Sequence, residues 1–174
     1  MIYFESNELF IRSMQDEDAE VIALEEEKQG WDRNVEKYLT RLKDQRENRC
    51  VSMVAVYRGE VAGYINVYFT PKNGPFAGKN MCEIKDFGVL EKFRRRGIGS
   101  SLMDAAEAFA AQYADVVSLG VGLYPSYGSA QRMYVKRGYI PDGSGVWYRD
   151  KNCPPYADVR NDDDLVLYLS KKLR

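Results

Sequence analysis

The segment from residue 82 to residue 113 constrains the fold of this 174-residue chain more than any other segment. Its first part, CEIKDFGVL, has the composition of a long and largely buried strand. The basic turn FRRRGIG follows at once, and the next residues repeat apolar side chains at helical spacing. These apolar positions are Leu102, Met103, Ala106, Phe109, Ala110 and Tyr113. A buried strand that leads through a tight turn into an amphipathic helix predicts an α/β fold.

The rest of the chain alternates strand and helix patterns around this unit. Helices are expected at residues 34–48 and 127–137, and Lys136-Arg137-Gly138 has the composition of a helix end. Another helix is expected after the capping-box signature of Ser13 and Asp16. Its expected apolar positions are Val21, Ile22 and Leu24. Strands are expected at residues 9–13, 51–58, 61–69, 116–123, 139–140, 145–149 and 165–170.

This order of elements predicts a mixed sheet, with a hairpin on one side and a β-α-β crossover in the middle. In the hairpin, Gly59 and Glu60 are expected to form a type II′ turn, because glycine stands first in a two-residue connection. A chain of this length is most simply one domain, so residues 1–174 are expected to form a single domain.

The composition excludes several classes of function. The chain has 25 Lys and Arg against 26 Asp and Glu, so its net charge predicts neither a nucleic acid nor a membrane partner. Histidine is absent, which excludes Ser-His-Asp and Cys-His nucleophile mechanisms. The three cysteines, Cys50, Cys82 and Cys153, are scattered and form no CxxC pair, so no metal site is expected.

The cellular compartment is predicted from the thiols and from the N-terminal sequence. Free cysteines are typical of a reducing environment. The N-terminus, MIYFESNELF, lacks the basic start and apolar core of a secretory signal, and no apolar run is long enough to span a bilayer. We therefore expect a cytoplasmic protein.

The arginine-glycine turn has the chemistry of a phosphate-binding site. At the start of a helix the first N–H groups have no intrahelical partner, and the helix dipole there favours an anion. Glycines at positions 97 and 99 would let a phosphate approach these groups. The alternative is a tight turn whose arginines simply face water. A dinucleotide-binding fingerprint is disfavoured because its third glycine is replaced by Leu102, and no Walker loop is present.

Two motifs of the sequence, one after the other along the chain, resemble those of the GNAT superfamily of acetyl-CoA-dependent N-acetyltransferases. Arg94-x-x-Gly97-x-Gly99 is similar to the family's R/Q-x-x-G-x-G/A signature, and Phe87 and Val89 stand before it as in the family's strand. Downstream, AQRMYVKRGY at residues 130–139 resembles the family's A-x-x-L-Y-x-x-x-G-F segment. The likeness covers about residues 9–141.

The resemblance implies an α/β (α+β) GNAT fold, with a central mixed sheet of about six to seven strands flanked by about four helices. A β-bulge would splay strands 83–90 and 116–123 apart, and acetyl-CoA would lie in the gap with its pantetheine paired to exposed backbone. Backbone near Val89 would polarise the thioester carbonyl, and amides from residues 95–100 would cradle the pyrophosphate. The implied cofactor-binding residues are Phe87, Gly88, Val89, Arg94, Arg95, Arg96, Gly97, Ile98, Gly99, Ser100 and Ser101.

The resemblance also assigns catalytic roles. Tyr134 matches the family's general acid, which protonates the leaving thiolate. Glu83 is the first candidate for the base, because the histone-type enzymes of the family place their glutamate at the same offset from the glycine turn. Asp86 is the second candidate, and a water held by backbone carbonyls is the third. Tyr127 departs from the family pattern, which often has asparagine at that position.

The acceptor is expected to be a primary amine of a small molecule or peptide. An aromatic wall beside carboxylates would suit a cationic amine, although the same residues could pack strand ends and a solvated turn. The wall would comprise Tyr124, Tyr127, Trp147, Tyr148 and Tyr156, with the acidic residues 162–164. The alternative functions are a silent acetyl-CoA sensor or docking module and, more distantly, a dinucleotide oxidoreductase. A homodimer formed through the terminal strand LVLYLS is a further expectation.

Overall fold

The computed structural model describes all residues, 1–174, as two compact units. The first unit comprises Met1–Tyr68 and Ile84–Phe109, and the second comprises Phe69–Glu83 and Ala110–Arg174. Strand β5 (Cys82–Val89) therefore begins in the second unit and continues into the first. The chain forms nine strands, β1 to β9, and four α-helices, α1 to α4. None of these helices combines the length and the apolar character needed to cross a membrane.

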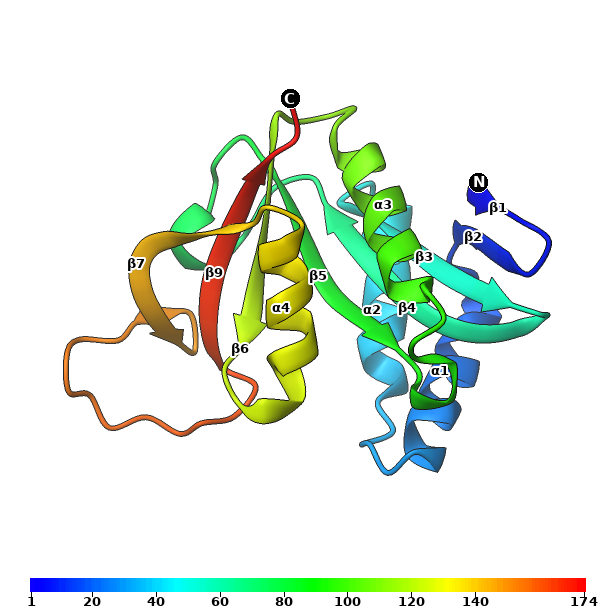
Figure 1. Ribbon diagram of the computed structural model, residues 1–174, viewed down its shortest axis with the longest axis horizontal. Coiled ribbons are helices and arrows are strands. Elements are labelled where there is room, and N and C mark those ends of the chain that lie inside the picture. The colour runs from blue at the N-terminus through cyan, green and yellow to red at the C-terminus, as the bar shows by residue number, and fades with distance from the viewer. The chain divides into compact units, whose positions relative to one another are not determined.

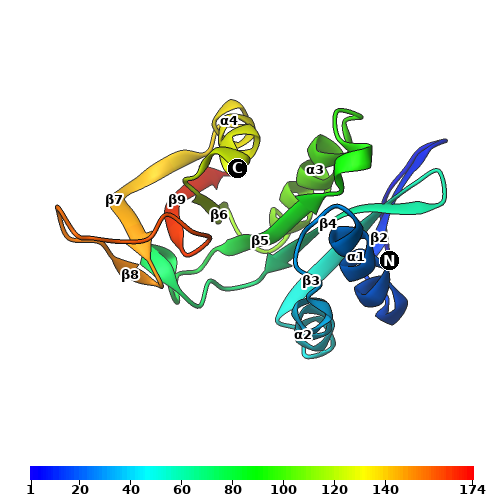
Figure 2. The same ribbon diagram turned by 90° about the horizontal axis from the view of Figure 1, so that it is seen from below.

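In the first unit the strand order is β1-β2-β3-β4-β5, and the first four strands pair antiparallel (Figure 1). These four are β1 (Ile2–Glu5), β2 (Leu9–Ser13), β3 (Cys50–Tyr57) and β4 (Glu60–Tyr68). The helices are α1 (Asp16–Lys28), α2 (Val35–Arg46) and α3 (Ile98–Ala110). Figure 2 shows α1 and α2 on one face of this part of the sheet and α3 on the other.

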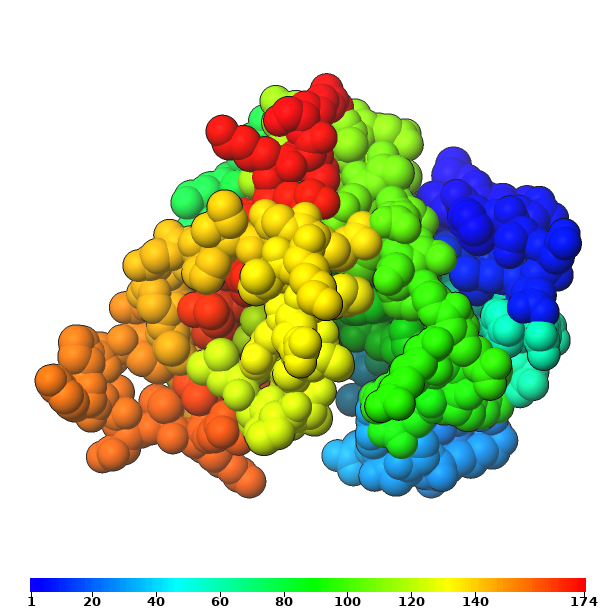
Figure 3. Space-filling view, in the orientation of Figure 1, coloured from blue at the N-terminus to red at the C-terminus, as the bar shows by residue number.

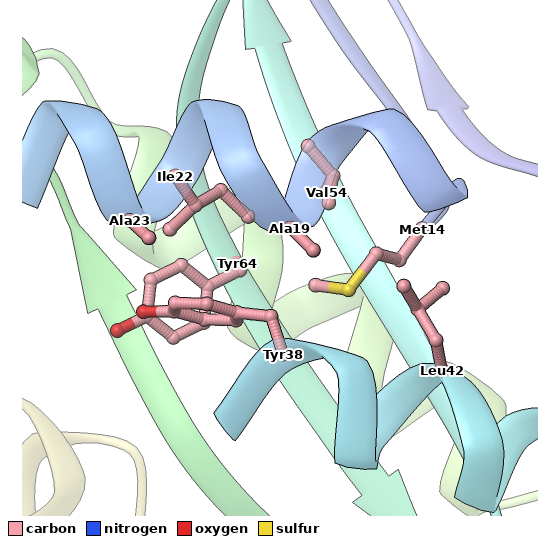
Figure 4. Packing of buried hydrophobic residues seen from close by; sticks show 8 residues of the cluster. All are labelled: Met14, Ala19, Ile22, Ala23, Tyr38, Leu42, Val54 and Tyr64. Atoms are coloured by element: carbon pink, nitrogen blue, oxygen red, sulfur yellow. The ribbon is translucent and has the colours of Figure 1, made fainter. Parts of the chain in front are cut away.

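Successive side chains of β4 point to opposite faces of the sheet, because side chains alternate along a strand. Tyr64 joins the buried cluster beneath α1 and α2, where it packs with Ile22, Tyr38 and Leu42 (Figure 4). Gly63 faces the other way, and a Cβ there would lie 3.3 Å from a side-chain carbon of Leu102 on α3. The alternation thus positions β4 between the two helical layers.

The capping box of α1 lies two residues later than expected. Gln15, not Ser13, is the N-cap, and the backbone N–H of Gln15 donates to Asp18 at 2.7 Å. The shift follows from two contacts. Met14 N–H donates to the Ser52 carbonyl, which keeps the chain extended past Ser13, and the Arg12 guanidinium binds both carboxylate oxygens of Asp18.

Two further local expectations were wrong. Val21 and Leu24 of α1 are exposed, and the helix instead buries Ala19, Ile22 and Ala23. The hairpin turn consists of Arg58 and Gly59, with φ of 50° and 86°, between the paired residues Tyr57 and Glu60. Two consecutive positive φ angles indicate a type I′ turn, whose twist matches that of the flanking strands.

In the second unit β9 lies between β6 and β7 and pairs antiparallel with both (Figure 1). Its elements are η1 (Gly74–Phe76), β6 (Val116–Gly122), η3 (Pro125–Tyr127), α4 (Gly128–Lys136), β7 (Ile140–Tyr148), β8 (Lys151–Asn152) and β9 (Leu165–Lys172). Because β9 is paired along both edges, LVLYLS offers no free strand edge for a dimer. The count of nine exceeds the expected six to seven strands because β1 and the two-residue β8 carry little sequence pattern.

Candidate active site

The turn before α3 has the backbone geometry of an anion-binding loop. The backbone of Arg95 and Gly97 adopts the left-handed conformation, with φ of 62° and 79°. The N–H of Ser101 donates an i to i−4 hydrogen bond to the Gly97 carbonyl at 3.0 Å. The preceding amides therefore lie before the first turn of α3, where N–H groups have no intrahelical partner. Left-handed residues in such a turn direct successive N–H groups toward one concavity.

The three arginines of this turn are exposed, and residues 94–97 lie on the surface of the first unit (green in Figure 3). Arg94 donates to Glu91 at 3.2 Å and to the Val89 carbonyl at 3.4 Å. The guanidinium of Arg96 stacks 5.6 Å from the centre of the Tyr57 ring. Arg94 thus forms an ion pair with Glu91, and Arg96 makes a cation–π contact with the Tyr57 ring.

Gly99 allows the start of α3 to pack closely on β5. A Cβ at Gly99 would lie 3.3 Å from Phe87 Cζ and 3.6 Å from Val89 Cγ2. The structure therefore brings Phe87, Val89 and the glycine turn together in the first unit.

Strand β5 contains a left-handed break of the kind expected for a β-bulge. Asp86 has φ of 48° in the middle of the strand. The buried side chain of Asn66, on β4, donates its Nδ2 to the carbonyls of Lys85 and Asp86 at 3.1 and 3.2 Å. An amide that binds two successive carbonyls can stabilise this irregular backbone, because it supplies donors to both acceptors.

An ion pair from α2 holds the same break. Arg41 Nε donates to Asp86 Oδ2 at 2.6 Å, and Arg41 Nη1 donates to the Tyr68 hydroxyl at 2.7 Å. The Tyr68 hydroxyl in turn donates to Asp44 at 2.5 Å. The Asp86 carboxylate is therefore engaged by Arg41. Sequence reasoning missed Arg41, which is separated from Asp86 by two strands of the chain.

The two proposed catalytic side chains lie in the second unit, and both are buried. Tyr134 projects from α4, with its ring centre 5.8 Å from that of Tyr139. Burial raises the pKa of Tyr134 well above the usual value of 10.0, so the phenol remains protonated at neutral pH. A protonated phenol has a proton to donate.

Glu83 stands in β5 close to an aromatic cluster, of which sequence reasoning named Trp147 but missed Phe76 and Tyr168. Tyr168 packs with Phe76 and Trp147, at ring separations of 6.3 and 5.8 Å. Burial, followed by the charges of Asp150 and Glu83, raises the pKa of Tyr168 to about 12. Gly74 was the available signal, since a Cβ there would lie 2.4 Å from Tyr168 Cζ. Carboxylates beside aromatic rings make this region suitable for a cation.

The expected aromatic wall is only partly assembled. Tyr127 donates its hydroxyl to Asp163 at 2.8 Å, and Tyr124 donates to the same oxygen. Tyr148 donates to Asp162 at 3.4 Å, whereas Tyr156 is fully exposed. These tyrosines hydrogen-bond the acidic segment and so use carboxylate oxygens that a cationic substrate would need.

Comparison with known proteins decides the family. Residues 11–139 match the model of the Acetyltransferase (GNAT) family. The chain belongs to this family. GNAT acetyltransferases use acetyl-CoA as acyl donor, and the fold is their mixed α/β fold, here with nine strands and four helices. The family named from the sequence, and its acyltransferase class, are thereby confirmed.

Relatives extend this likeness over most of the chain. The uncharacterized N-acetyltransferase CT2212 of Chlorobaculum tepidum is 30% identical over 106 residues, which cover 58% of this chain and 60% of that protein. Ard1 from Thermoplasma volcanium is 23% identical, with a TM-score of 0.67 over 94% of this chain and 97% of its own. The yncA structure from Salmonella typhimurium, which contains acetyl-CoA, is 16% identical, with a TM-score of 0.68 over 97% and 95%. At these identities the two structures support the fold alone.

Proposed function

We propose that this GNAT protein transfers the acetyl group of acetyl-CoA to a primary amine of a small molecule or peptide. The observation that carries the proposal is the turn at residues 94–101, with two left-handed residues ahead of a helix N-terminus and three exposed arginines. A pyrophosphate is the part of coenzyme A that such a turn can bind. Amides from residues 95–100 would contact it, and backbone at Gly88 and Val89 would pair with the pantetheine.

The chemistry requires one bond exchange and two proton transfers. The amine nitrogen bonds to the thioester carbon, the C–S bond breaks, and the sulfur leaves as a thiolate. Tyr134 would protonate that thiolate, because burial keeps its phenol protonated. Glu83 would accept the amine proton, directly or through a water. Attack occurs in a ternary complex, without a covalent enzyme intermediate.

The direct test is release of CoA thiol from acetyl-CoA across a panel of acceptors. The panel contains polyamines, aminoglycosides, free amino acids, and peptides with a free N-terminus or lysine, each corrected for hydrolysis. Release with one class supports the transferase and identifies its acceptor. Binding of acetyl-CoA without release with any acceptor would instead favour a sensing module.

Arg95→Ala is expected to weaken CoA binding by about 10- to 100-fold, since a charge-assisted hydrogen bond contributes about 1.5–3 kcal/mol. Arg95 is the appropriate arginine because Arg94 is bound to Glu91 and Arg96 stacks on Tyr57. Calorimetry with CoA and with pantetheine provides the comparison, because pantetheine lacks the phosphates. Equal losses for both ligands would contradict a role in pyrophosphate binding.

Glu83→Gln is expected to lower kcat at least about tenfold, because the variant keeps the side-chain shape but cannot accept a proton. The KM for acetyl-CoA should change little. A pH profile of kcat is the diagnostic measurement, since loss of a base removes the acidic limb of the profile. Wild-type kcat with the acidic limb intact would leave Asp86 or a water as the base.

A further inference from the structure

The side chain of Lys37, on α2, occupies a cage built by two tyrosines and a carboxylate in the first unit. Its ammonium lies 4.5 Å from the centre of the Tyr38 ring and 5.3 Å from that of Tyr64. Lys37 Nζ donates to the Tyr64 hydroxyl at 3.4 Å and lies 3.8 Å from Glu26 Oε1. These are the contacts by which a protein recognises a primary ammonium group.

The walls of the cage are buried and polar. Glu26 is 2% exposed and accepts from the Tyr64 hydroxyl at 2.7 Å. Tyr38 is 1% exposed, and its ring packs edge-on against that of Tyr64, with the ring centres 5.1 Å apart. Figure 4 shows the two tyrosines of this cluster with their hydroxyls directed to the same side. Two aromatic rings and a buried carboxylate thus surround the lysine ammonium.

The cage adjoins the strand assigned to the coenzyme. Tyr64 lies against Gly88 of β5, where an added Cβ would be 3.0 Å from the Tyr64 hydroxyl. The same hydroxyl contacts Lys37 Nζ. The Tyr64 hydroxyl therefore contacts both the lysine nitrogen and the strand at which we place the pantetheine.

We propose that Lys37 is an internal acetyl acceptor, so that the protein acetylates its own Lys37. The inference rests on the proposed function, because it needs acetyl-CoA bound along β5. The Lys37 ammonium loses a proton to the Glu26 carboxylate, and its Nζ then bonds to the thioester carbon. The C–S bond breaks and the CoA sulfur leaves as a thiolate. The thiolate takes up the second proton that Nζ loses, so that the products are CoA thiol and Lys37 as a neutral amide.

Lys43 provides a matched control on the same helix. It is exposed on α2, so simple chemical acetylation should modify it at least as readily as the partly covered Lys37. The protein is incubated with acetyl-CoA, and acetyl occupancy at each lysine is measured by peptide mass spectrometry. Acetic anhydride on the same protein gives the chemical reference. We expect acetyl-CoA to favour Lys37 over Lys43 by at least about tenfold relative to that reference, because positioning raises the effective concentration.

Three further results decide the proposal. The rate of Lys37 labelling should not depend on protein concentration, and Glu26→Gln should reduce it while labelling at Lys43 stays constant. Lys37→Arg should remove the fast-labelled site and leave the fold intact, as judged by CoA binding. Suppose that the protein acetylates an acceptor from the panel, but that the ratio of acetyl occupancy at Lys37 to that at Lys43 equals the ratio given by acetic anhydride. This result would overturn the inference about Lys37 and leave the proposed function standing. Absence of both reactions would overturn the proposed function as well.

Discussion

Replacing Tyr134 with phenylalanine is expected to lower kcat by about 100-fold or more, the usual contribution of a positioned general acid. The variant removes one oxygen and keeps the ring that packs against Tyr139. Dissociation of acetyl-CoA should therefore change little, so that the loss appears in kcat and not in the affinity. Single-turnover measurements separate the chemical step from product release.

The pH dependence of this loss follows from the burial of Tyr134. Burial raises the pKa of the phenol above 10.0, so the group is protonated throughout the neutral and mildly alkaline range. The fold-loss in Tyr134→Phe should accordingly be constant across that range. Any alkaline limb of the wild-type profile within it must belong to another group.

Tyr139→Phe is the matched control, because it removes a phenol oxygen from the neighbouring buried ring of the same unit. We expect its kcat to stay close to that of the wild type. An equal loss in both variants would show that packing, and not proton donation, is what Tyr134 supplies. Wild-type turnover in Tyr134→Phe, under conditions where chemistry limits the rate, would remove Tyr134 from the mechanism.

Local chemistry explains why much of the fold and the turn could be predicted from sequence. Gly97 and Gly138 occupy left-handed positions, with φ of 79° and 88°, at the start of one helix and the end of another. Glycine is favoured at both, since other residues are strained there. The apolar stripe of α3 is likewise a property of consecutive residues, and Leu102, Met103 and Ala106 are fully buried.

The missed features depend on contacts between distant parts of the chain. Gln15 replaces Ser13 as the N-cap because Ser52, from another strand, keeps the chain extended through Met14. The ring of Tyr168 occupies space that the distant Gly74 leaves free, because a Cβ there would lie 2.4 Å from Tyr168 Cζ. Apolar residues repeat every two positions in a strand and every 3.6 positions in a helix. These repeats do not reveal contacts between distant segments, because each describes one element at a time.

The pair of Arg41 and Asp86 is the most consequential of these distant contacts, because it holds the left-handed break of β5. Arg41→Gln is expected to lower the free energy of unfolding by about 2–3 kcal/mol, somewhat below the cost of breaking a fully buried pair. The side chains of Arg41 and Asp86 are 17% and 25% exposed. Because water partly screens the pair, we expect a smaller loss of unfolding free energy than for a fully buried pair. Acetyl-CoA affinity should fall as well, since Gly88 and Val89 follow the break directly in β5.

Arg46→Gln is the control for Arg41→Gln, because it makes the same substitution on the same helix, α2. Arg46 pairs with Asp16, but their side chains are 61% and 67% exposed, so water can replace the lost contact. We expect a change within about 1 kcal/mol and no effect on coenzyme binding. Urea unfolding gives the stabilities, and calorimetry with acetyl-CoA gives the affinities.

A double-mutant cycle with Asp86→Asn then isolates the coupling between Arg41 and Asp86. If the pair holds the strand, Asp86→Asn in the Arg41→Gln background should cost less than it does in the wild type, because the uncompensated carboxylate has been removed. Additive losses would mean that Arg41 acts through Tyr68 and Asp44 instead. Lost stability with unchanged coenzyme affinity would show that Asn66, which binds two carbonyls of β5, is sufficient to keep the backbone in place.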